Sequence, residues 1–283
     1  MTDDATHRAE VEAWRQGRYA ALRRDLGWLT LSGLGWLKPG INRIGSDADA
    51  DVTLPSGPPQ AGTITLNDAE VVADGAFTHG GAPVSGLRMT NDQEGEPTML
   101  ELGALRLCVI ERGGRLAVRT WDPEAPARRE FNGIGHWPVD PAWRLAARFE
   151  ATPGRMLRVP EAHGIADEQL SPGGVAFEIE GVTHRLEALS GGGSGELWLV
   201  FGDLTNGHET YGGGRFLYSG APDAGGGVLV DFNRSYNPPC VFSPFATCPL
   251  PWPANRLPIR IEAGERALSV PKEIGHPRTR PLD

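Results

Sequence analysis

The stretch that decides the fold runs from Asp203 to Glu265. Its first part reads DLTNGHETYGGGRFLYSG (residues 203–220), and its second part reads VLVDFNRSYNPPCVFSPFATCPLPWPANRLPIRIEAGE (residues 228–265). Residues 228–230 are typical of a buried strand, whereas Pro238 and Pro239 cannot donate to a sheet ladder. We therefore predict a strand that ends in a rigid, irregular loop, and such loops commonly carry binding groups.

The composition of the whole chain favours a β-rich fold. Hydrophobic residues make up 40% of the 283 residues, which is enough for a real core, and the chain contains 38 Gly and 24 Pro. High turn content with scarce helical periodicity indicates a mainly β protein of antiparallel sheets. The predicted strands cover residues 41–44, 52–54, 62–66, 70–73, 100–102, 105–111, 116–120, 145–150, 156–159, 174–180, 182–189, 196–201 and 228–230.

The N-terminal part is the exception, because the apolar spacing over residues 4–24 predicts a helix. Trp28 and Trp36 follow it in a short apolar stretch that we expect to act as a hydrophobic plug. A segment rich in Pro, Gly and charge, residues 121–141, is the best candidate for a boundary. We expect four parts: the helix and Trp-rich plug (1–39), a β-sandwich (40–122), a C-terminal β domain as a barrel or curved sheet (123–270), and a tail (271–283).

Charge and hydropathy exclude some partners. The formal net charge is −9, and a negative chain is repelled by nucleic acid and by anionic membranes. The sequence contains no apolar run of membrane-spanning length, and its N-terminal residues lack the apolar core of a signal peptide. We therefore expect a soluble cytoplasmic protein that binds neither nucleic acid nor membrane.

The candidate site lies in the stretch that opens this section. Arg215 offers a planar fork for a carboxylate or phosphate, and Asp231 is the candidate general base. Polar groups that could orient a ligand complete the predicted binding set, which is Tyr211, Arg215, Asn233, Arg234, Tyr236 and Asn237. The alternative is a structural network that holds the proline-rich loop on the sheet, because buried charges occur in pairs.

Cys240 and Cys248 lie eight residues apart in the same stretch. They could be reduced and packed in the core, or joined in a disulfide, although a cytoplasmic location opposes one. Cys240 is also a candidate catalytic nucleophile, provided that a neighbouring group stabilises its thiolate. A zinc site is disfavoured because only two thiolates are in view, and we predict no metal.

Two regions resemble known families. GINRIGSDADADVTLP (residues 40–55) and LELGALRLCVIERGG (residues 100–114) are similar to the opening and closing strands of forkhead-associated (FHA) domains. Where that family has a Gly-Arg pair, this chain has Gly45 and Ser46. The resemblance therefore implies a sandwich but no phosphothreonine recognition, which needs the arginine fork.

The second resemblance covers nearly the whole chain. The motifs ETYGGGRFL (209–217), VDFNRSYNPPCVFSPFATCPLP (230–251) and NRLPIRIEAGE (255–265), together with GWLTLSGLGWLKPGINRIGSD (27–47), resemble the DUF1684 family of bacterial and archaeal proteins. The residues that carry the resemblance are Tyr211, Arg215, Asp231, Asn237, Cys240 and Cys248. It implies that they belong together, and it implies no reaction, cofactor or ligand.

Two functions therefore compete. The first is a site for a small polar or anionic molecule in the C-terminal β domain, with or without catalysis. The second is a non-enzymatic protein-interaction module that uses the FHA-like sandwich. The chain contains no Gly-x-Ser-x-Gly elbow, Walker loop, HExxH motif or CxxC pair. A common hydrolase, nucleoside triphosphatase or zinc protease is therefore disfavoured.

Overall fold

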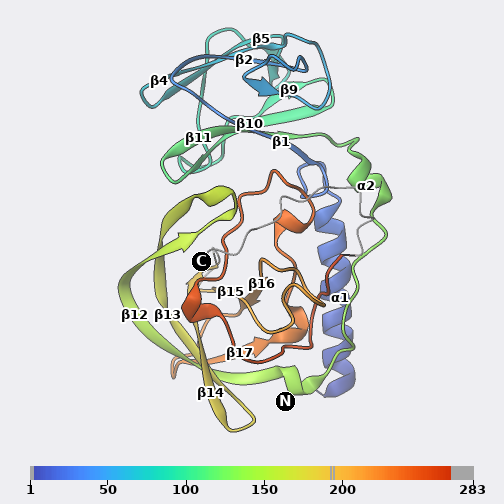
Figure 1. The fold of residues 1–283 in the computed structure, drawn as a ribbon, viewed down its shortest axis with the longest axis vertical. Helices are drawn as coiled ribbons and strands as arrows, with labels where there is room; N and C mark the ends of the chain where they lie inside the picture. The colour runs from blue at the N-terminus through green and yellow to red at the C-terminus, as the bar shows by residue number, and fades with distance from the viewer. Residues whose placement is uncertain (1–2, 192, 194, 269–283) are drawn as a thin grey trace.

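The computed structural model describes residues 3–268 except 192 and 194. It has one long helix, a β-sandwich and a second, curled β-sheet, so the predicted mainly β fold with an N-terminal helix is confirmed. In Figure 1 the sandwich lies above the curled sheet, and the helix runs along one side of the lower part.

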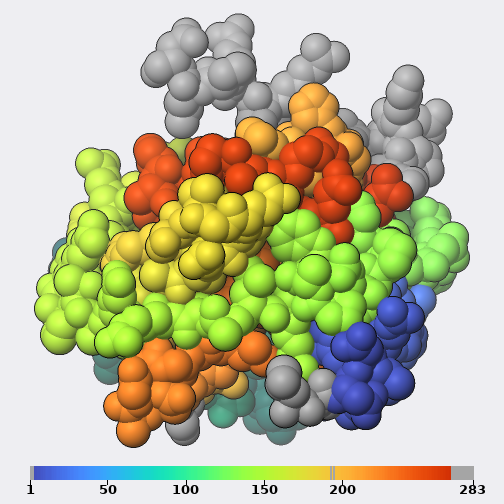
Figure 2. Space-filling model, turned by 90° about the horizontal axis from the view of Figure 1, so that it is seen from below, coloured from blue at the N-terminus to red at the C-terminus, as the bar shows by residue number. Residues whose placement is uncertain are grey.

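Helix α1 spans Asp4–Leu22, close to the predicted range. It begins at Asp3, whose carboxylate accepts hydrogen bonds from the backbone N–H groups of Ala5 and Thr6, both at 2.9 Å. Such a cap satisfies donors that have no partner inside the helix. The helix packs on the C-terminal part, where it touches the loop that follows β17. From below, α1 lies at one edge of the molecule beside the segment that follows the sandwich (Figure 2).

The sandwich consists of two sheets that enclose one core. The first has the order β3-β2-β4-β5-β8, and the second has the order β1-β11-β10-β9-β6-β7. Their strands are β1 (Leu31–Trp36), β2 (Gly40–Gly45), β3 (Val52–Thr53), β4 (Gly62–Asn67), β5 (Glu70–Gly75), β6 (Thr78–His79), β7 (Ala82–Pro83), β8 (Leu87–Met89), β9 (Leu100–Leu102), β10 (Leu105–Arg112) and β11 (Arg115–Trp121). Ile44 and Ile64 of one sheet meet Leu107 and Val118 of the other in that core.

β1 lies in the stretch where we expected only an apolar plug. It pairs antiparallel with β11, and its register shifts between Leu31 and Gly33. That irregularity breaks the period-two alternation by which a strand is identified in a sequence. The sandwich accordingly begins at Leu31. The structure describes its two sheets, while the further likeness to FHA domains stays a prediction.

A short helix, α2 (Pro126–Glu130), and a one-turn helix, η1 (Pro141–Trp143), lead from the sandwich to the second sheet. This sheet has the order β16-β15-β14-β13-β12-β17. Its strands are β12 (Arg144–Pro160), β13 (Ala166–Ile179), β14 (Val182–Ser190), β15 (Leu197–Phe201), β16 (Arg215–Ser219) and β17 (Gly227–Asp231). The sheet curls so far that β16 and β17, at opposite ends of the order, contact each other.

Two strands of this sheet, β12 and β13, are longer than predicted. Residues 145–150 and 156–159 form one strand, β12, and its pairing with β13 shifts register between Ala151 and Arg155. The Pro153–Gly154 pair in that interval marks an irregularity within the strand, where proline is tolerated. Glu180 and Gly181 form the turn between β13 and β14, since both have positive φ, 52° and 75°, as a two-residue hairpin turn requires.

The remaining short helices lie in the C-terminal part of the chain. They are η2 (Ala162–Gly164), η3 (Phe232–Arg234), η4 (Pro239–Val241) and η5 (Pro253–Asn255). The same part of the chain contributes side chains to the core of the curled sheet, namely Phe232, Leu257, Ile261 and Ala263. Among the helices that the structure describes, none is long and apolar enough to cross a membrane.

Two glycines predict opposite effects of the same substitution. Gly17 lies exposed in the middle of α1, and a Cβ atom there would meet nothing within 4 Å. We expect Gly17→Ala to raise the free energy of unfolding by about 0.5–1 kcal/mol, because alanine loses less conformational entropy in a helix. Gly214 has φ +87°, and its Cβ would press on Pro251 and on the Phe201 carbonyl oxygen at 2.6 Å.

Gly214→Ala should therefore lower the free energy of unfolding by more than about 1 kcal/mol. Urea unfolding of both variants and the wild type gives the two values. Equal effects of the two substitutions would contradict the assigned backbone conformations.

Candidate functional site

A cavity of about 620 Å³ opens between α1 and the curled sheet. Six of its lining side chains are aromatic, and one is a cation. The lining residues are Trp14, Gly17, Arg18 and Ala21 from α1, Trp28 from the following turn, Trp198 from β15, Phe216 and Tyr218 from β16, and Tyr236, Pro239, Thr247, Cys248 and Pro249 from the proline-rich loop. We call it the aromatic pocket.

Three rings form a stacked row on the sheet side of the aromatic pocket. Trp198 lies over Tyr218 with ring centroids 6.0 Å apart, and Tyr218 lies over Tyr236 at 6.1 Å. Phe216 meets the edges of Trp198 and Tyr236 at right angles. Trp14 faces Tyr236 from the helix side at 6.3 Å. Burial raises the pKa of Tyr236 well above its ordinary value, so its hydroxyl is neutral at physiological pH.

Arg18 is the cation that lines the aromatic pocket. Its Nε donates to Glu265 at 2.5 Å, and its Nη2 donates to the Asn237 carbonyl at 2.7 Å. The guanidinium lies over the Tyr236 ring, 4.3 Å from the centroid. Its remaining nitrogen, Nη1, makes no hydrogen bond with any residue in the described part of the chain. The planar fork is thus held in place by two partners, and both N–H groups of Nη1 are left without a partner among the described residues.

Glu265 holds this arginine from inside the protein. Its side chain is fully buried, and its Oε2 accepts a hydrogen bond from the Asn237 N–H at 2.7 Å. Burial raises the pKa of Glu265, and the Arg18 guanidinium opposes that rise. A buried carboxylate needs such partners to stay charged.

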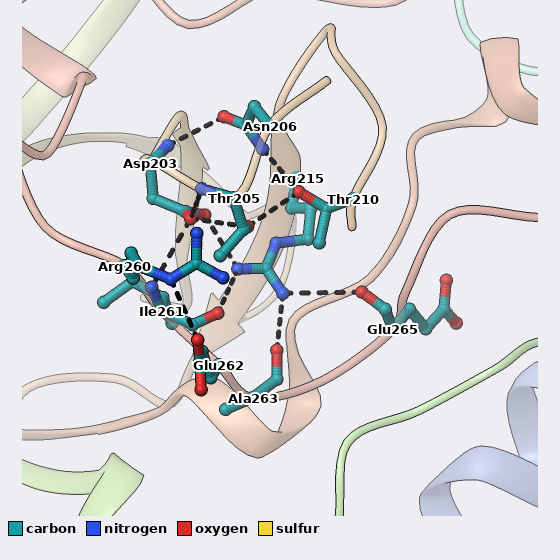
Figure 3. A network of polar contacts seen from close by, with 10 residues as sticks. All are labelled: Asp203, Thr205, Asn206, Thr210, Arg215, Arg260, Ile261, Glu262, Ala263 and Glu265. Atoms are coloured by element: carbon teal, nitrogen blue, oxygen red, sulfur yellow. Dashed lines mark hydrogen bonds and ion pairs between the residues drawn. The ribbon is translucent and has the colours of Figure 1, made fainter. Parts of the chain in front are cut away.

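Arg215, which we predicted to bind a ligand, lies elsewhere. Its side chain is fully buried in an ion pair with Asp203, with Nη2 and Oδ2 2.7 Å apart. Its guanidinium also donates to the carbonyl groups of Ile261 and Ala263 at 2.8 and 2.5 Å (Figure 3). Burial lowers the pKa of Arg215, and Asp203 counteracts this. The arginine thereby fastens the C-terminal segment to β16.

The other oxygen of Asp203 extends this network. It accepts hydrogen bonds from the N–H of Thr205 at 2.8 Å and from its hydroxyl at 2.6 Å. Thr210 contacts Thr205 at 2.8 Å, and its hydroxyl oxygen also accepts from Asn206 (Figure 3). Every one of these partners is a protein group, so the network is suited to holding the loop between β15 and β16.

Asp231, Asn233 and Arg234 gather at a second place, against the start of α1. The carboxylate of Asp231 lies 2.8 Å from Nε2 of the buried His7 and accepts from the Asn233 amide at 2.9 Å. Asn233 also donates to the Asp140 carbonyl. Arg234 is half-exposed and lies 3.5 Å from both Glu10 and Asp231. A role for Asp231 as a general base stays a prediction.

Of the predicted ligand-binding residues, only Tyr236 lines the aromatic pocket. Asn237 is fully buried and donates to the Arg266 carbonyl at 2.8 Å. Tyr211 packs beside Cys240 and Cys248 in the core next to the pocket. All three cysteines of the chain are buried, free thiols. No group of three or more potential metal ligands occurs among the described residues.

Sequence reasoning missed the helical wall of the pocket. Trp14, Arg18 and Ala21 follow the i, i+4, i+7 spacing of one helix face. A signal was present in the sequence. Trp14 and Arg18 share a helix face that was predicted to be apolar, and a cation on such a face indicates something other than ordinary core packing. What the spacing could not show is that this face opposes β15 and β16, which lie about 180 residues further along the chain.

Behind the pocket, two buried charges lie where the sandwich meets the C-terminal part. Arg119 of β11 donates to the Thr247 hydroxyl at 3.2 Å, and Thr247 lines the pocket. Glu161, at the end of β12, pairs through its backbone with Pro249. One oxygen of the Glu161 carboxyl is buried and has no hydrogen-bond partner among the described residues. Burial raises its pKa to about 7, although Arg112 and Arg119 oppose the rise.

Comparisons with known proteins place the chain in a family. The model of the family described as "Protein of unknown function (DUF1684)" matches residues 129–266. The chain belongs to the DUF1684 family. The predicted resemblance to DUF1684 is therefore confirmed over residues 129–266, and its N-terminal motif, residues 27–47, lies outside the matched segment.

One solved relative is an uncharacterised protein of Haloarcula marismortui, whose structure was determined in solution by NMR. It is 30% identical, and the match covers 51% of this chain and 82% of that chain, with a TM-score of 0.42. The comparison with curated proteins gives no match.

The matched DUF1684 segment supplies the sheet and loop side of the aromatic pocket. Trp198, Tyr218, Tyr236 and Cys248 lie within residues 129–266. Trp14, Arg18 and Trp28 lie outside the segment that the family model matches. The pocket therefore depends on the way α1 docks onto the DUF1684 segment.

The Asp203–Arg215 pair predicts a large loss of stability when one charge is removed. We expect Asp203→Asn to lower the free energy of unfolding by about 3–5 kcal/mol, because Arg215 then stays buried without a counter-charge. Glu209 provides a matched control, since it pairs with Arg260 at 2.7 Å near the surface. Glu209→Gln should change stability by about 0–1 kcal/mol. Chemical denaturation measures both, and a small effect at Asp203 would contradict the structural role of the network.

Glu161 predicts a pH dependence of stability. Its pKa is about 7 in the folded protein, against an ordinary value of 4.5. Between these values the folded state binds a proton that the unfolded state releases, so the contribution of Glu161 to stability is complete below about pH 4.5 and is lost as the pH rises through about 7. Relative to the wild type, Glu161→Gln should gain in melting temperature over that interval.

Melting curves at a series of pH values check this prediction. Glu168→Gln, which removes an exposed carboxylate from the neighbouring strand, serves as the control. Parallel curves for the wild type and Glu161→Gln across the whole interval would show that the carboxyl is not buried as described.

Proposed function

We propose that this protein binds a small molecule that has a flat aromatic body and a carboxylate group, in the aromatic pocket between α1 and the curled sheet. The observation that carries the proposal is the lining: six aromatic rings share the pocket with one arginine, whose Nη1 makes no hydrogen bond to any described residue. Small-molecule sites are usually apolar clefts with a few placed polar groups. The cavity volume of about 620 Å³ lies within their usual range of roughly 300–1,000 Å³.

The aromatic rings support a flat ligand. Trp198, Tyr218 and Tyr236 are stacked nearly parallel, with interplanar angles of 12° and 13°. Trp14 stands opposite on the helix, tilted by 54° to Tyr236. Offset or edge contacts with such rings contribute about 0.5–1.5 kcal/mol beyond the burial of apolar area. A ligand with an aliphatic chain would not gain this aromatic contribution to the binding free energy.

The arginine supports a carboxylate. Arg18 is fixed by Glu265 and by the Asn237 carbonyl, so little rotamer entropy remains to be lost when it donates again. Its charge is shared with Glu265, which keeps the free pocket close to neutral. A ligand with one negative charge therefore suits the pocket better than a polyanion.

A second cavity, on the sandwich, gives weaker support for ligand binding. It has about half the volume, 310 Å³, and its lining includes Arg43, Asp47 and Asp49. Its one arginine, Arg43, already donates to Asp51 and to the Asp49 carbonyl. The aromatic pocket is therefore the preferred site.

Isothermal titration calorimetry with indole-3-carboxylate and its neutral analogue indole-3-carboxamide tests the proposal. The wild type should bind the carboxylate more tightly. Trp14→Ala should weaken binding of both probes by about tenfold, which corresponds to the roughly 1.4 kcal/mol expected for a lost aromatic contact. Arg18→Lys keeps a charge beside Glu265 but loses the planar fork, so it should abolish the preference for the carboxylate.

Trp36→Ala is the matched control. Trp36 is half-buried on β1 and contacts Arg115, away from the pocket. It should leave both affinities unchanged. Absence of heat with either probe at millimolar concentration, or equal losses in Trp14→Ala and Trp36→Ala, would overturn the proposed site for this ligand class.

A further inference from the structure

The proline-rich loop brings two cysteines into contact beside the aromatic pocket. Cys240 lies in η4 and Cys248 follows eight residues later, and the N–H of Cys240 donates to the sulfur of Cys248 at 3.1 Å. The exposed fractions of the two residues are 8% for Cys240 and 1% for Cys248. Cys248 lines the pocket, as does Pro239, the residue before Cys240, so a molecule that enters the pocket lies next to the pair.

The two thiols have unequal environments. The Cys240 thiol takes part in hydrogen bonds with Cys248 and with the Tyr211 hydroxyl, and these lower its pKa. Burial raises the pKa of the Cys248 thiol well above its ordinary value. The Cys248 thiol therefore donates to the Cys240 sulfur, and the negative charge is more stable on Cys240. This asymmetry suits a nucleophile with a resolving partner, because the thiolate is the reactive form.

Cys108 shows what an isolated cysteine of the same core looks like. It belongs to the same cluster of buried residues, with an exposed fraction of 1%. Burial raises the pKa of its thiol to about 11. Cys108 therefore provides a natural internal contrast with the pair.

We propose that Cys240 and Cys248 form a redox-active dithiol that a hydroperoxide oxidises through the aromatic pocket. In the first step the Cys240 thiolate attacks the outer oxygen of the hydroperoxide. The O–O bond breaks, Cys240 becomes a sulfenic acid, and the leaving oxygen takes up a proton to give an alcohol, or water from hydrogen peroxide. The sulfur loses two electrons, and the peroxide gains them.

In the second step the Cys248 sulfur attacks the sulfenic sulfur of Cys240. The S–O bond breaks, the oxygen leaves as water with the proton of the Cys248 thiol, and a disulfide forms. A small thiol in excess restores the dithiol by exchange through a mixed disulfide. The dithiol chemistry does not rest on the ligand proposed above, and the two can fail separately.

Tyr211 is the positioning residue of this pair. Its side chain is half-buried against the two cysteines, and burial raises the pKa of its own hydroxyl above the ordinary value. A neutral hydroxyl can donate to the Cys240 thiolate at physiological pH. Tyr211→Phe removes that donor and keeps the ring.

The experiment treats the reduced, folded, full-length protein with one equivalent of cumene hydroperoxide, which is apolar and aromatic, or of hydrogen peroxide. Intact mass should fall by two hydrogen atoms, and peptide mapping should join Cys240 to Cys248. Dithiothreitol should restore the original mass. Cys108→Ala should behave like the wild type, whereas Cys240→Ser should form no intramolecular disulfide.

Tyr211→Phe should slow the oxidation at neutral pH and approach the wild-type rate in alkaline solution, where Cys240 ionises without help. Peptide mapping of the wild type decides the proposal even if a variant does not fold. Oxidation of the folded wild type that falls equally on Cys108, or that yields sulfinic and sulfonic acids without a Cys240–Cys248 link, would overturn it. Calorimetry of Cys240→Ser with the two indole probes distinguishes the two proposals. If this variant binds the probes as the wild type does, a failure of the dithiol proposal is not a failure of the ligand proposal.

Discussion

The buried carboxylate of Glu265 is the interaction on which the arrangement of the C-terminal part depends. One of its oxygens receives Arg18 of the helix, and the other receives the N–H of Asn237 in the proline-rich loop. The carbonyl groups just before it, at Ile261 and Ala263, receive the guanidinium of Arg215. A charge with no access to water can remain only where such partners surround it. The helix, the loop and the last described segment are therefore fixed relative to one another, and the aromatic pocket lies where they meet.

This constraint explains why the polar residues of the proline-rich loop form hydrogen bonds with the strands and segments around it. Prolines remove backbone donors and prevent the loop from joining a sheet. The backbone groups that remain need partners, and buried side chains supply them. Asn237 binds Arg266, and Asn255 receives the Glu187 N–H and donates to the carbonyls of Glu187 and Val200. The result is an irregular loop with the rigidity of regular structure, which can hold aromatic rings at fixed positions.

The sequence was informative where a local pattern and the final environment agree. The helix over residues 4–22 and the hairpin turn at Glu180 follow from spacing and turn chemistry alone, since neighbouring residues determine both. Of the residues predicted for the candidate site, the structure places Arg215 in a buried ion pair and Tyr236 in the aromatic pocket, and their functional roles stay predictions. Dense charge in an apolar stretch indicates either a binding site or a buried network, and only tertiary contacts distinguish the two. Arg18 could not be assigned to the site because its partner, Glu265, lies 247 residues away.

The buried charges and the groups that line the pocket are different residues, and this division shows which groups a ligand could use. In the C-terminal part, Asp203 and Arg215 bind each other and other protein groups, although Nε of Arg215 is buried without a partner among the described residues. These charges hold the loop in place, so they are poorly suited to take up a ligand without loss of stability. The groups outside that network are of another kind: stacked rings, Nη1 of Arg18, and two cysteines in contact, with the backbone N–H of Cys240 donating to the Cys248 sulfur. Arg18 holds Glu265 through its Nε, so a ligand on Nη1 leaves that ion pair in place. The site can therefore be altered at Trp14 or Cys240 with less risk to the fold than at Arg215, which makes the structural and functional roles separable by mutation.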